Sequence, residues 1–212
     1  MLTAADAAEL ERCIRRGGLA LFPADTVYGL AVDPESSAAV ERLYRLKGRP
    51  PTRPAAVMFF ALERLIATLP ELPARTRAAA ERLLPGPVTL VVPNPRRRFP
   101  LACGPAPERL GVRVPALAGA LSPLRDVDAP VLQSSANLSA GPDAARFDDV
   151  DPAVRAAVDL ALDGGELPGT PSTVVDLSDY DATGDVRILR EGAVPAATVQ
   201  DALGRASSGG RD

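Results

Sequence analysis

The chain contains no histidine and no tryptophan among its 212 residues. Without histidine, a Ser-His-Asp triad, a Cys-His dyad and a histidine-ligated zinc site are all excluded. Acid–base chemistry would therefore depend on carboxylates, on tyrosine, on the single lysine Lys47 or on the substrate itself. The two cysteines, Cys13 and Cys103, are too few and too far apart in the sequence to predict a metal or disulfide framework.

Long apolar runs and an extreme charge are missing as well. No stretch approaches the roughly 20 apolar residues that a membrane helix needs, and the acidic N-terminus does not resemble a signal peptide. A net charge of −3 gives no general attraction to nucleic acid. Hydrophobic and charged contents of 46% and 24% are typical of a soluble globular protein, which we expect in the cytoplasm without a membrane partner. One domain is predicted over residues 1–204, with a disordered tail at 205–212.

Lysine occurs once among the 24 basic residues, at Lys47. Lysine presents a compact point charge on a flexible stem, whereas arginine presents a rigid planar fork. Lys47, Gly48 and Arg49 close an amphipathic helical pattern over 37–47. The three residues fit a clamp on phosphates, with the glycine allowing a close backbone turn. They fit equally a basic helix C-terminus that the macrodipole favours.

Helical and strand patterns alternate along the chain, and this predicts an α/β fold. Hairpin-like strand pairs interrupt the alternation, so the sheet is expected to be mixed. The proline-rich stretch 94–109 is predicted to be a mobile loop. Helices are expected at 4–16, 37–47, 62–67, 74–84, 116–124, 152–157 and 196–204. Strands are expected at 19–22, 57–60, 88–92, 111–114, 130–133, 158–162, 172–176 and 186–190.

Small hydroxyl and amide residues gather at the ends of predicted strands, in the segments 25–29, 134–139, 171–173 and 190–192. Ligands of α/β folds bind at strand ends, where loop amides and short polar side chains converge. Taken singly, each cluster is more typical of a cap or a turn. Together with Lys47 and Arg49, the four clusters favour a binding site. No Walker motif or GxGxxG fingerprint supports a P-loop or dinucleotide fold.

Seven motifs, in order, resemble the YrdC/Sua5 family over about residues 17–193, nearly the whole chain. They are PADTVYGLAVD at 23–33, KGRP at 47–50, PGPVTLVV at 85–92, GVRVP at 111–115, SSANLS at 134–139, PSTVVDL at 171–177 and ILREGA at 188–193. The resemblance implies a twisted mixed sheet flanked by helices, with a deep and positively lined concave cavity.

The activity implied by the resemblance is that of an L-threonylcarbamoyladenylate synthase, a nucleotidyltransferase. It joins L-threonine, bicarbonate and ATP, with Mg2+, and releases pyrophosphate; the product serves the t6A37 modification of tRNA. Both reactants carry their own nucleophile, so positioning and charge stabilisation suffice in place of a histidine base. Implied partners are the three substrates, with tRNA or double-stranded RNA and other proteins of the t6A pathway as further candidates.

The resemblance also implies roles for individual residues. Lys47 and Arg49 would be catalytic and would hold the triphosphate. The remaining nucleotide-binding residues would be Arg113, Ser135, Asn137, Ser139 and Arg190. The threonine-binding residues would be Thr26, Tyr28, Met58, Ser172 and Thr173. No protein-bound metal is expected.

Three positions depart from the family pattern. Ala24 replaces a threonine, Met58 stands where a histidine usually faces the substrate, and Leu117 occupies a second histidine region. The glycine of the SSANLS motif also comes one residue late, at Gly141. Nucleotide-side motifs are therefore better kept than threonine-side motifs. A paralog of the YciO kind, acting on a different small amine or acid, and an RNA-binding module remain as alternatives.

Overall fold

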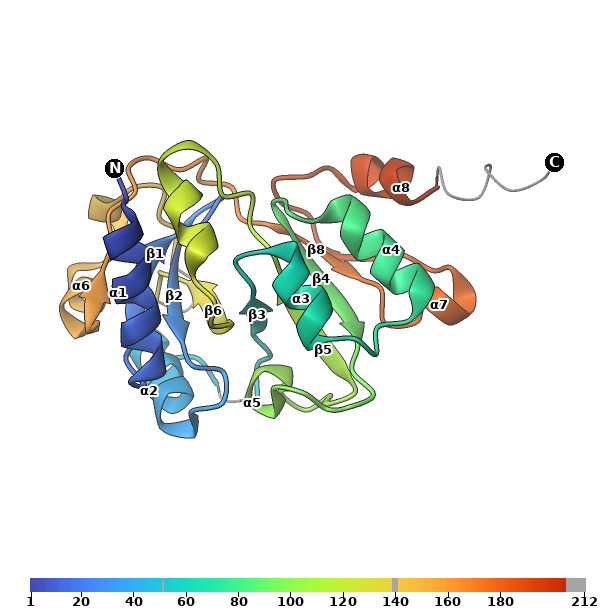
Figure 1. The fold of residues 1–212 in the computed structure, drawn as a ribbon, viewed down its shortest axis with the longest axis horizontal. Helices are drawn as coiled ribbons and strands as arrows, with labels where there is room; N and C mark the ends of the chain where they lie inside the picture. The colour runs from blue at the N-terminus through green and yellow to red at the C-terminus, as the bar shows by residue number, and fades with distance from the viewer. Residues whose placement is uncertain (51, 139–140, 205–212) are drawn as a thin grey trace.

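The computed structural model describes residues 1–50, 52–138 and 141–204. Within these residues, nine strands form one mixed sheet in the order β7-β1-β2-β6-β3-β5-β4-β8-β9 (Figure 1). The strands are β1 Ala20–Pro23, β2 Tyr28–Val32, β3 Ala56–Met58, β4 Val88–Pro93, β5 Arg109–Arg113, β6 Val131–Ser135, β7 Leu160–Ala161, β8 Thr173–Asp176 and β9 Arg187–Arg190. The α/β class and the mixed sheet predicted from the sequence are confirmed.

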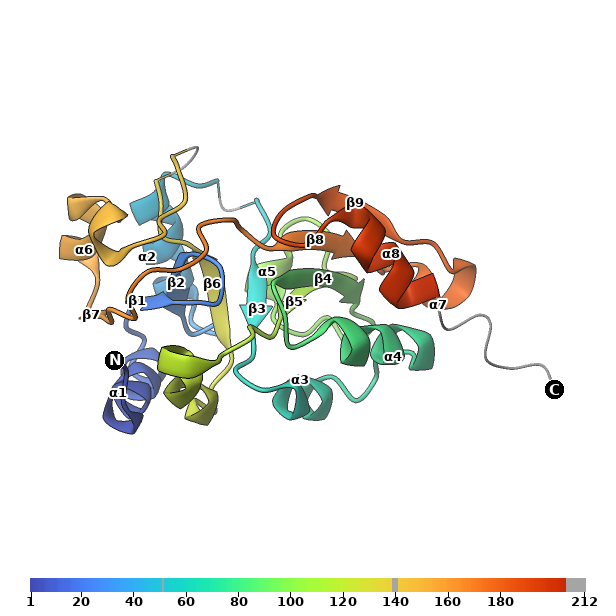
Figure 2. The ribbon, with the colours of Figure 1, turned by 90° about the horizontal axis from the view of Figure 1, so that it is seen from above.

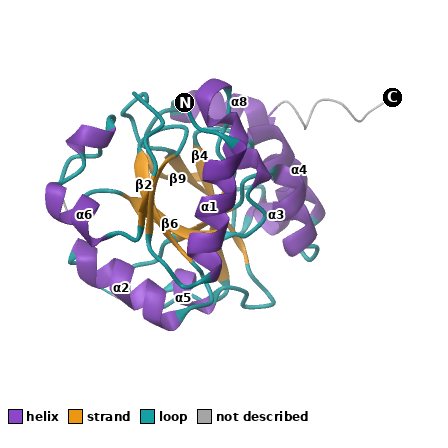
Figure 3. Ribbon diagram, turned by 60° about the vertical axis from the view of Figure 1, so that its left-hand side comes forward, coloured by secondary structure: helices purple, strands orange, loops and turns teal. Residues whose placement is uncertain are grey.

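Helices surround the strands (Figure 3). They are α1 Ala4–Arg15, α2 Ser37–Lys47, α3 Leu62–Thr68, α4 Ala74–Leu83, α5 Pro100–Cys103, α6 Pro152–Ala157, α7 Tyr180–Thr183 and α8 Ala196–Gly204, with 3-10 segments η1 Gly119–Asp126 and η2 Phe147–Asp149. Figure 2 shows α1, α3 and α4 on one side of the sheet and α2 and α6 on the other. None of the described helices is long and apolar enough to cross a membrane.

Burial follows the pairing of the strands. Every residue of β1 and β2 is buried, as expected for strands covered on both faces. In contrast, β4 alternates between buried and partly exposed residues, with Val88, Leu90 and Val92 in the core and Thr89 and Val91 on the other face. The sheet thus presents one partly open face across β4, β5 and β8, and a cavity lies on this face.

Three expectations for local structure are corrected. Residues 28–32 form a strand that the sequence patterns did not predict, and it pairs with β1 and β6. The helix expected at 116–124 is the 3-10 segment η1, because Gly119 has a positive φ of 55° and Pro123 lies inside the segment. The strand expected at 158–162 is confined to Leu160–Ala161.

The stretch 94–109, expected to be a mobile loop, contains the helix α5. The side chain of Asn94 joins its two ends by hydrogen bonds. Asn94 donates from Nδ2 to the carbonyl oxygens of Arg98 and Pro107, at 2.9 and 3.0 Å, and accepts from the amide of Arg98 at 2.9 Å. Asn94 is 2% exposed. Because the buried amide of Asn94 has its hydrogen bonds satisfied, it holds the two ends of the stretch 94–109 together.

Candidate active site

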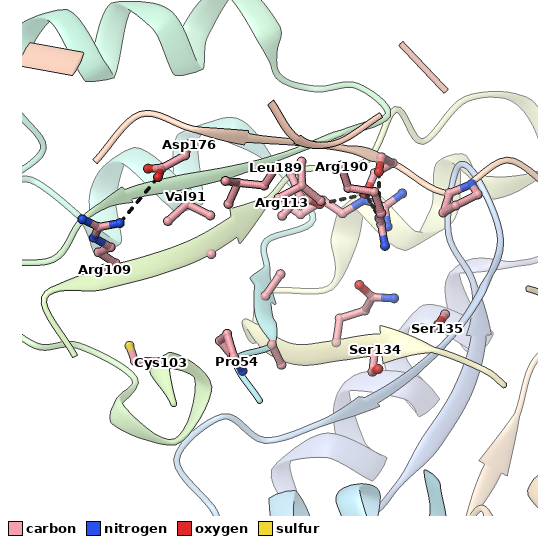
Figure 4. A pocket seen from close by; sticks show the side chains of 18 of the residues that line it. Pro54, Val91, Cys103, Arg109, Arg113, Ser134, Ser135, Asp176, Leu189 and Arg190 are labelled. Atoms are coloured by element: carbon pink, nitrogen blue, oxygen red, sulfur yellow. Dashed lines mark hydrogen bonds and ion pairs between the residues drawn. The ribbon is translucent and has the colours of Figure 1, made fainter. Parts of the chain in front are cut away.

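A cavity of about 390 Å³ lies on the open face of the sheet (Figure 4). Residues of β3, β4, β5, β6, β8 and β9 line it, together with loop residues, and the lining spans the chain from Val27 to Arg190. One end is bounded by Val91, Arg109 and Asp176, and the other by Ser134 and Ser135. The strand ends that the sequence marked as polar clusters therefore converge on one hollow.

Four arginines line the cavity: Arg49, Arg109, Arg113 and Arg190. Arg109 lies 3.5 Å from Asp176, and Arg113 forms an ion pair with Asp25. Arg49 and Arg190 have no carboxylate partner among the described residues. Uncompensated positive charge in a partly enclosed space favours an anionic ligand.

Arg49 is held at the cavity wall by neutral oxygens. Its Nη1 donates to Ser134 Oγ at 3.1 Å and its Nη2 donates to the Pro54 carbonyl, while its guanidinium lies over the Tyr44 ring. Burial lowers the pKa of Arg49 from its ordinary value, with Tyr44 opposing the change. Nε of Arg49 is buried without a partner among the described residues. The side chain is therefore fixed in place, with its charge left for a ligand.

Arg190 approaches the cavity from the edge strand β9. Its Nη2 donates to the Ser172 carbonyl oxygen at 2.7 Å, and Ser172 Oγ lies 2.8 Å from Thr89 Oγ1. The predicted residues Ser172 and Arg190 are thus neighbours at the cavity wall. Gly192 fits beside them because it has no side chain: a Cβ there would lie 2.7 Å from the Ser172 carbonyl carbon.

Arg113, at the cavity wall, is buried together with Asp25. Their side chains are only 4% and 5% exposed, and Arg113 Nη2 also donates to Thr26 Oγ1 at 2.5 Å. Asp25 accepts a further hydrogen bond from the Ala116 amide at 2.8 Å. The pair fixes the turn before β2 against the segment that follows β5. Thr26 therefore reaches the site through Arg113 and is not itself a lining residue.

Lys47 lies beneath the turn that follows β6. Its Nζ donates to the carbonyl oxygens of Ser135 and Asn137 and to Asn137 Oδ1, the last two at 2.6 and 2.9 Å. Ser135 Oγ donates to the same Asn137 Oδ1 at 2.6 Å. Burial lowers the pKa of Lys47 to about 8; Arg49 adds to the effect and Asp143 opposes it.

Of the two serines predicted to bind nucleotide, Ser135 lines the cavity, whereas Ser139 lies outside the described residues.

Besides Thr26, three other residues expected on the threonine side do not line the cavity: Tyr28, Thr173 and Met58. The Tyr28 hydroxyl is bonded to Asp163 and Gly165, and burial together with Asp163 raises the pKa of Tyr28. Thr173 Oγ1 donates to the Val194 carbonyl at 2.6 Å. Met58 is fully buried, two residues from the lining residue Ala56 and on the same strand face.

Several lining residues were not among the predicted site residues. Strand alternation within VTLVV would have pointed to Thr89 as the polar residue on the open face. Ser134 stood beside Ser135 in a segment already singled out. No sequence signal marked Arg109, and Asp176 stood in the PSTVVDL motif without a predicted role. The two residues come together only through the pairing of β4 with β5 and β8.

The described residues do not offer a protein-built metal site. No group of three acidic, histidine or cysteine side chains comes together in the part of the chain that the structure describes. Of the two carboxylates that line the cavity, Asp176 is bound to Arg187 at 2.8 Å and to the Ser178 amide.

The fold is that of a mixed α/β protein whose cavity is lined by four arginines, and sequence comparison gives the family. The Sua5/YciO/YrdC family model, described as "Telomere recombination", matches residues 12–192. The chain therefore belongs to this family, as its motifs indicated.

Curated relatives carry the name threonylcarbamoyl-AMP synthase. The protein of Pyrococcus abyssi is 32% identical over 192 residues, covering 90% of this chain and 55% of the relative. That of Chromohalobacter salexigens is 36% identical over 177 residues, covering 82% and 94%. The chain spans 55% and 56% of the lengths of the Pyrococcus abyssi and Bacillus subtilis relatives.

Solved structures share the fold. P. abyssi Sua5 complexed with L-threonine has a TM-score of 0.78 at 28% identity, covering 96% of this chain and 59% of that chain. E. coli YciO has a TM-score of 0.76 at 23% identity, covering 94% and 95%. The YciO likeness bears on the fold alone.

Proposed function

We propose that this protein is an L-threonylcarbamoyladenylate synthase, a nucleotidyltransferase that makes threonylcarbamoyl-AMP and pyrophosphate from L-threonine, bicarbonate and ATP. The observation that carries the proposal is the cavity in which Arg49 and Arg190 lack carboxylate partners among the described residues. The names of its relatives give the substrate class. The product would serve the t6A37 modification of tRNA in the cytoplasm, with tRNA and t6A-pathway proteins as downstream partners.

The reaction needs no protein nucleophile. The threonine nitrogen bonds to the carbon of CO2 derived from bicarbonate and loses a proton, which gives a carbamate. A carbamate oxygen then attacks the α-phosphorus of ATP, and the bond from that phosphorus to the bridging oxygen breaks as pyrophosphate leaves. The absence of histidine is compatible with this route, because orientation and charge stabilisation carry the catalysis.

The arginines supply that stabilisation in our proposal. Arg49 and Arg190 would face the phosphates, because their charges are free of carboxylates in the described residues. Arg113 would also take part in nucleotide binding, with its side chain held in place by Asp25 and Thr26. Mg2+ would arrive bound to the ATP phosphates, as is usual for this cation. Fixed donors of this kind cost no reorganisation as charge develops on pyrophosphate.

Pyrophosphate release tests the proposal. Protein incubated with ATP and bicarbonate is expected to release pyrophosphate only when threonine is added. Arg49→Met is expected to lower kcat/KM by about two orders of magnitude, because charge stabilisation in an enclosed site is lost. Arg45→Met is the matched control, since Arg45 is exposed near the end of α2, four residues before Arg49. Release that does not depend on any amine would disprove a synthase.

A paralog acting on another small amine or acid is the second candidate. Fully buried Ala24 and Met58 favour it, because an alanine and a methionine replace the threonine and the histidine of the family pattern. The same assay with a panel of amino acids and small amines separates the two. A substrate more apolar than threonine, with a higher kcat/KM, would establish the paralog.

A further inference from the structure

Lys47 uses all of its hydrogen-bonding capacity inside the protein. Its ammonium has three N–H donors, and three oxygens of Ser135 and Asn137 accept from it. Lys47 is 4% exposed and is not among the described residues that line the cavity. No N–H of Lys47 is left for a ligand in this arrangement.

The turn after β6 is folded around this ammonium. Two backbone carbonyl oxygens and one side-chain oxygen converge on the same point, and their partial negative charges repel without a cation between them. Asn137 is further fixed by Ser135 Oγ and through its own Nδ2, which donates to the Gly141 carbonyl. Lys47 therefore holds the conformation in which Ser135 lines the cavity.

Arg49, two residues further on, is placed differently. It lines the cavity and donates to Ser134 Oγ and the Pro54 carbonyl, with no carboxylate partner among the described residues. The αL conformation of Gly48, φ 61°, turns the chain between the two basic residues. One basic residue thus supports the turn from beneath while the other faces the cavity.

We propose that Lys47 is a positioning residue that acts on the nucleotide through the Ser135–Asn137 turn and does not contact the phosphates. This inference rests on the proposed function, in which the cavity takes a nucleotide. It separates the roles of Lys47 and Arg49, which the sequence had placed together on the triphosphate.

The number of phosphates on the ligand distinguishes the two roles. A lost phosphate contact weakens ATP binding more than AMP binding, and leaves adenosine binding unchanged. A lost support for the turn weakens all three ligands by the same factor. Calorimetry of Lys47→Met with adenosine, AMP and ATP at one ionic strength is expected to show an equal loss, on the order of tenfold.

Two variants calibrate this series. Arg49→Met is expected to lose affinity in proportion to phosphate number. Arg45→Met, on the exposed side of α2, is expected to bind all three ligands as the wild type does. A Lys47→Met loss that grows from adenosine to ATP would overturn the inference and leave the synthase proposal intact. Failure of the wild type to bind any nucleotide would instead remove the proposed function.

Hydrogen exchange tests the turn without any ligand. The Ala136 amide donates to the Tyr28 carbonyl at 2.9 Å and reports on the attachment of the turn. Lys47→Met is expected to exchange faster at residues 135–137, whereas Arg49→Met is not. Unchanged exchange in a folded Lys47→Met protein would refute the positioning role. Should Lys47→Met fail to fold, Lys47→Gln, which retains an amide donor, takes its place in both experiments.

Discussion

Asp25 and Arg113 form an ion pair that is almost wholly removed from water, with side chains 5% and 4% exposed. Breaking such a pair leaves an uncompensated buried charge, and the guanidinium then lacks its partner. Asp25→Asn is therefore expected to lower the free energy of unfolding by about 3 kcal/mol in a urea titration. Asp185→Asn, with an exposed carboxyl, is the charge-matched control and should change it by less than about 0.5 kcal/mol. Equal effects from the two variants would show that the Asp25 pair is not buried in solution.

The lowered pKa of Lys47 leads us to expect that nucleoside binding depends on pH. Burial lowers its pKa to about 8; Arg49 and Arg53 contribute in the same direction, and Asp143 opposes them. The charged form, which holds the Ser135–Asn137 turn, predominates below that pH and is lost as the pH rises through it. Adenosine affinity is expected to fall between about pH 7 and pH 9 in the wild type, and to stay low and flat in Lys47→Met. A wild-type affinity that is constant over this range would contradict the requirement for the charged lysine.

At the scale of the element, the junction between β8 and β9 depends on close backbone contact. Thr173 Oγ1 accepts from the amides of Gly192 and Val194, both at 3.0 Å, and ties the turn after β9 to β8. A Cβ at Gly192 would collide with the Pro171 carbonyl oxygen, because backbone atoms fill that space. The position of Arg190 at the cavity wall depends on this fit.

Gly192→Ala is expected to destabilise the protein by about 1–3 kcal/mol, because the backbone must shift to admit the methyl group. ATP affinity should fall with it, since Arg190 and Ser172 would move apart. Gly204→Ala is the control: nothing lies within 4 Å of a Cβ there, so its stability should be unchanged or slightly higher. Thermal unfolding and calorimetry measure both effects; an unaffected Gly192→Ala would mean that this junction is loosely packed.

The elements also show which helices and strands local sequence patterns can predict and which they cannot. Helix α6 Pro152–Ala157 begins and ends where its pattern predicted, because Asp151 caps it and the proline stands at its first position. Strand β2 was missed, because YGLAV is short, contains a glycine and follows a polar turn; its partners β1 and β6 make it a strand. Pairing across the sheet is a tertiary effect that local propensity does not contain.

At the scale of the whole molecule, the cavity joins residues that are far apart in the chain, from Val27 to Arg190. Motifs in the sequence identified Arg49, Arg113, Ser135, Ser172 and Arg190, all of which line it. They did not reveal that the Tyr28 and Thr173 hydroxyls are used within the fold. A motif records which residue types occur together, whereas the direction of each side chain follows from strand register.

The central claim is that this cavity joins threonine, bicarbonate and ATP, and the carbon of bicarbonate tests it most directly. The protein is incubated with ATP, threonine and carbon-labelled bicarbonate, and the products are analysed by mass spectrometry. We expect an adduct of threonine and AMP whose carbamoyl carbon carries the label, and no adduct without threonine. Unlabelled AMP and pyrophosphate alone, under conditions in which ATP binding is measurable, would contradict the claim.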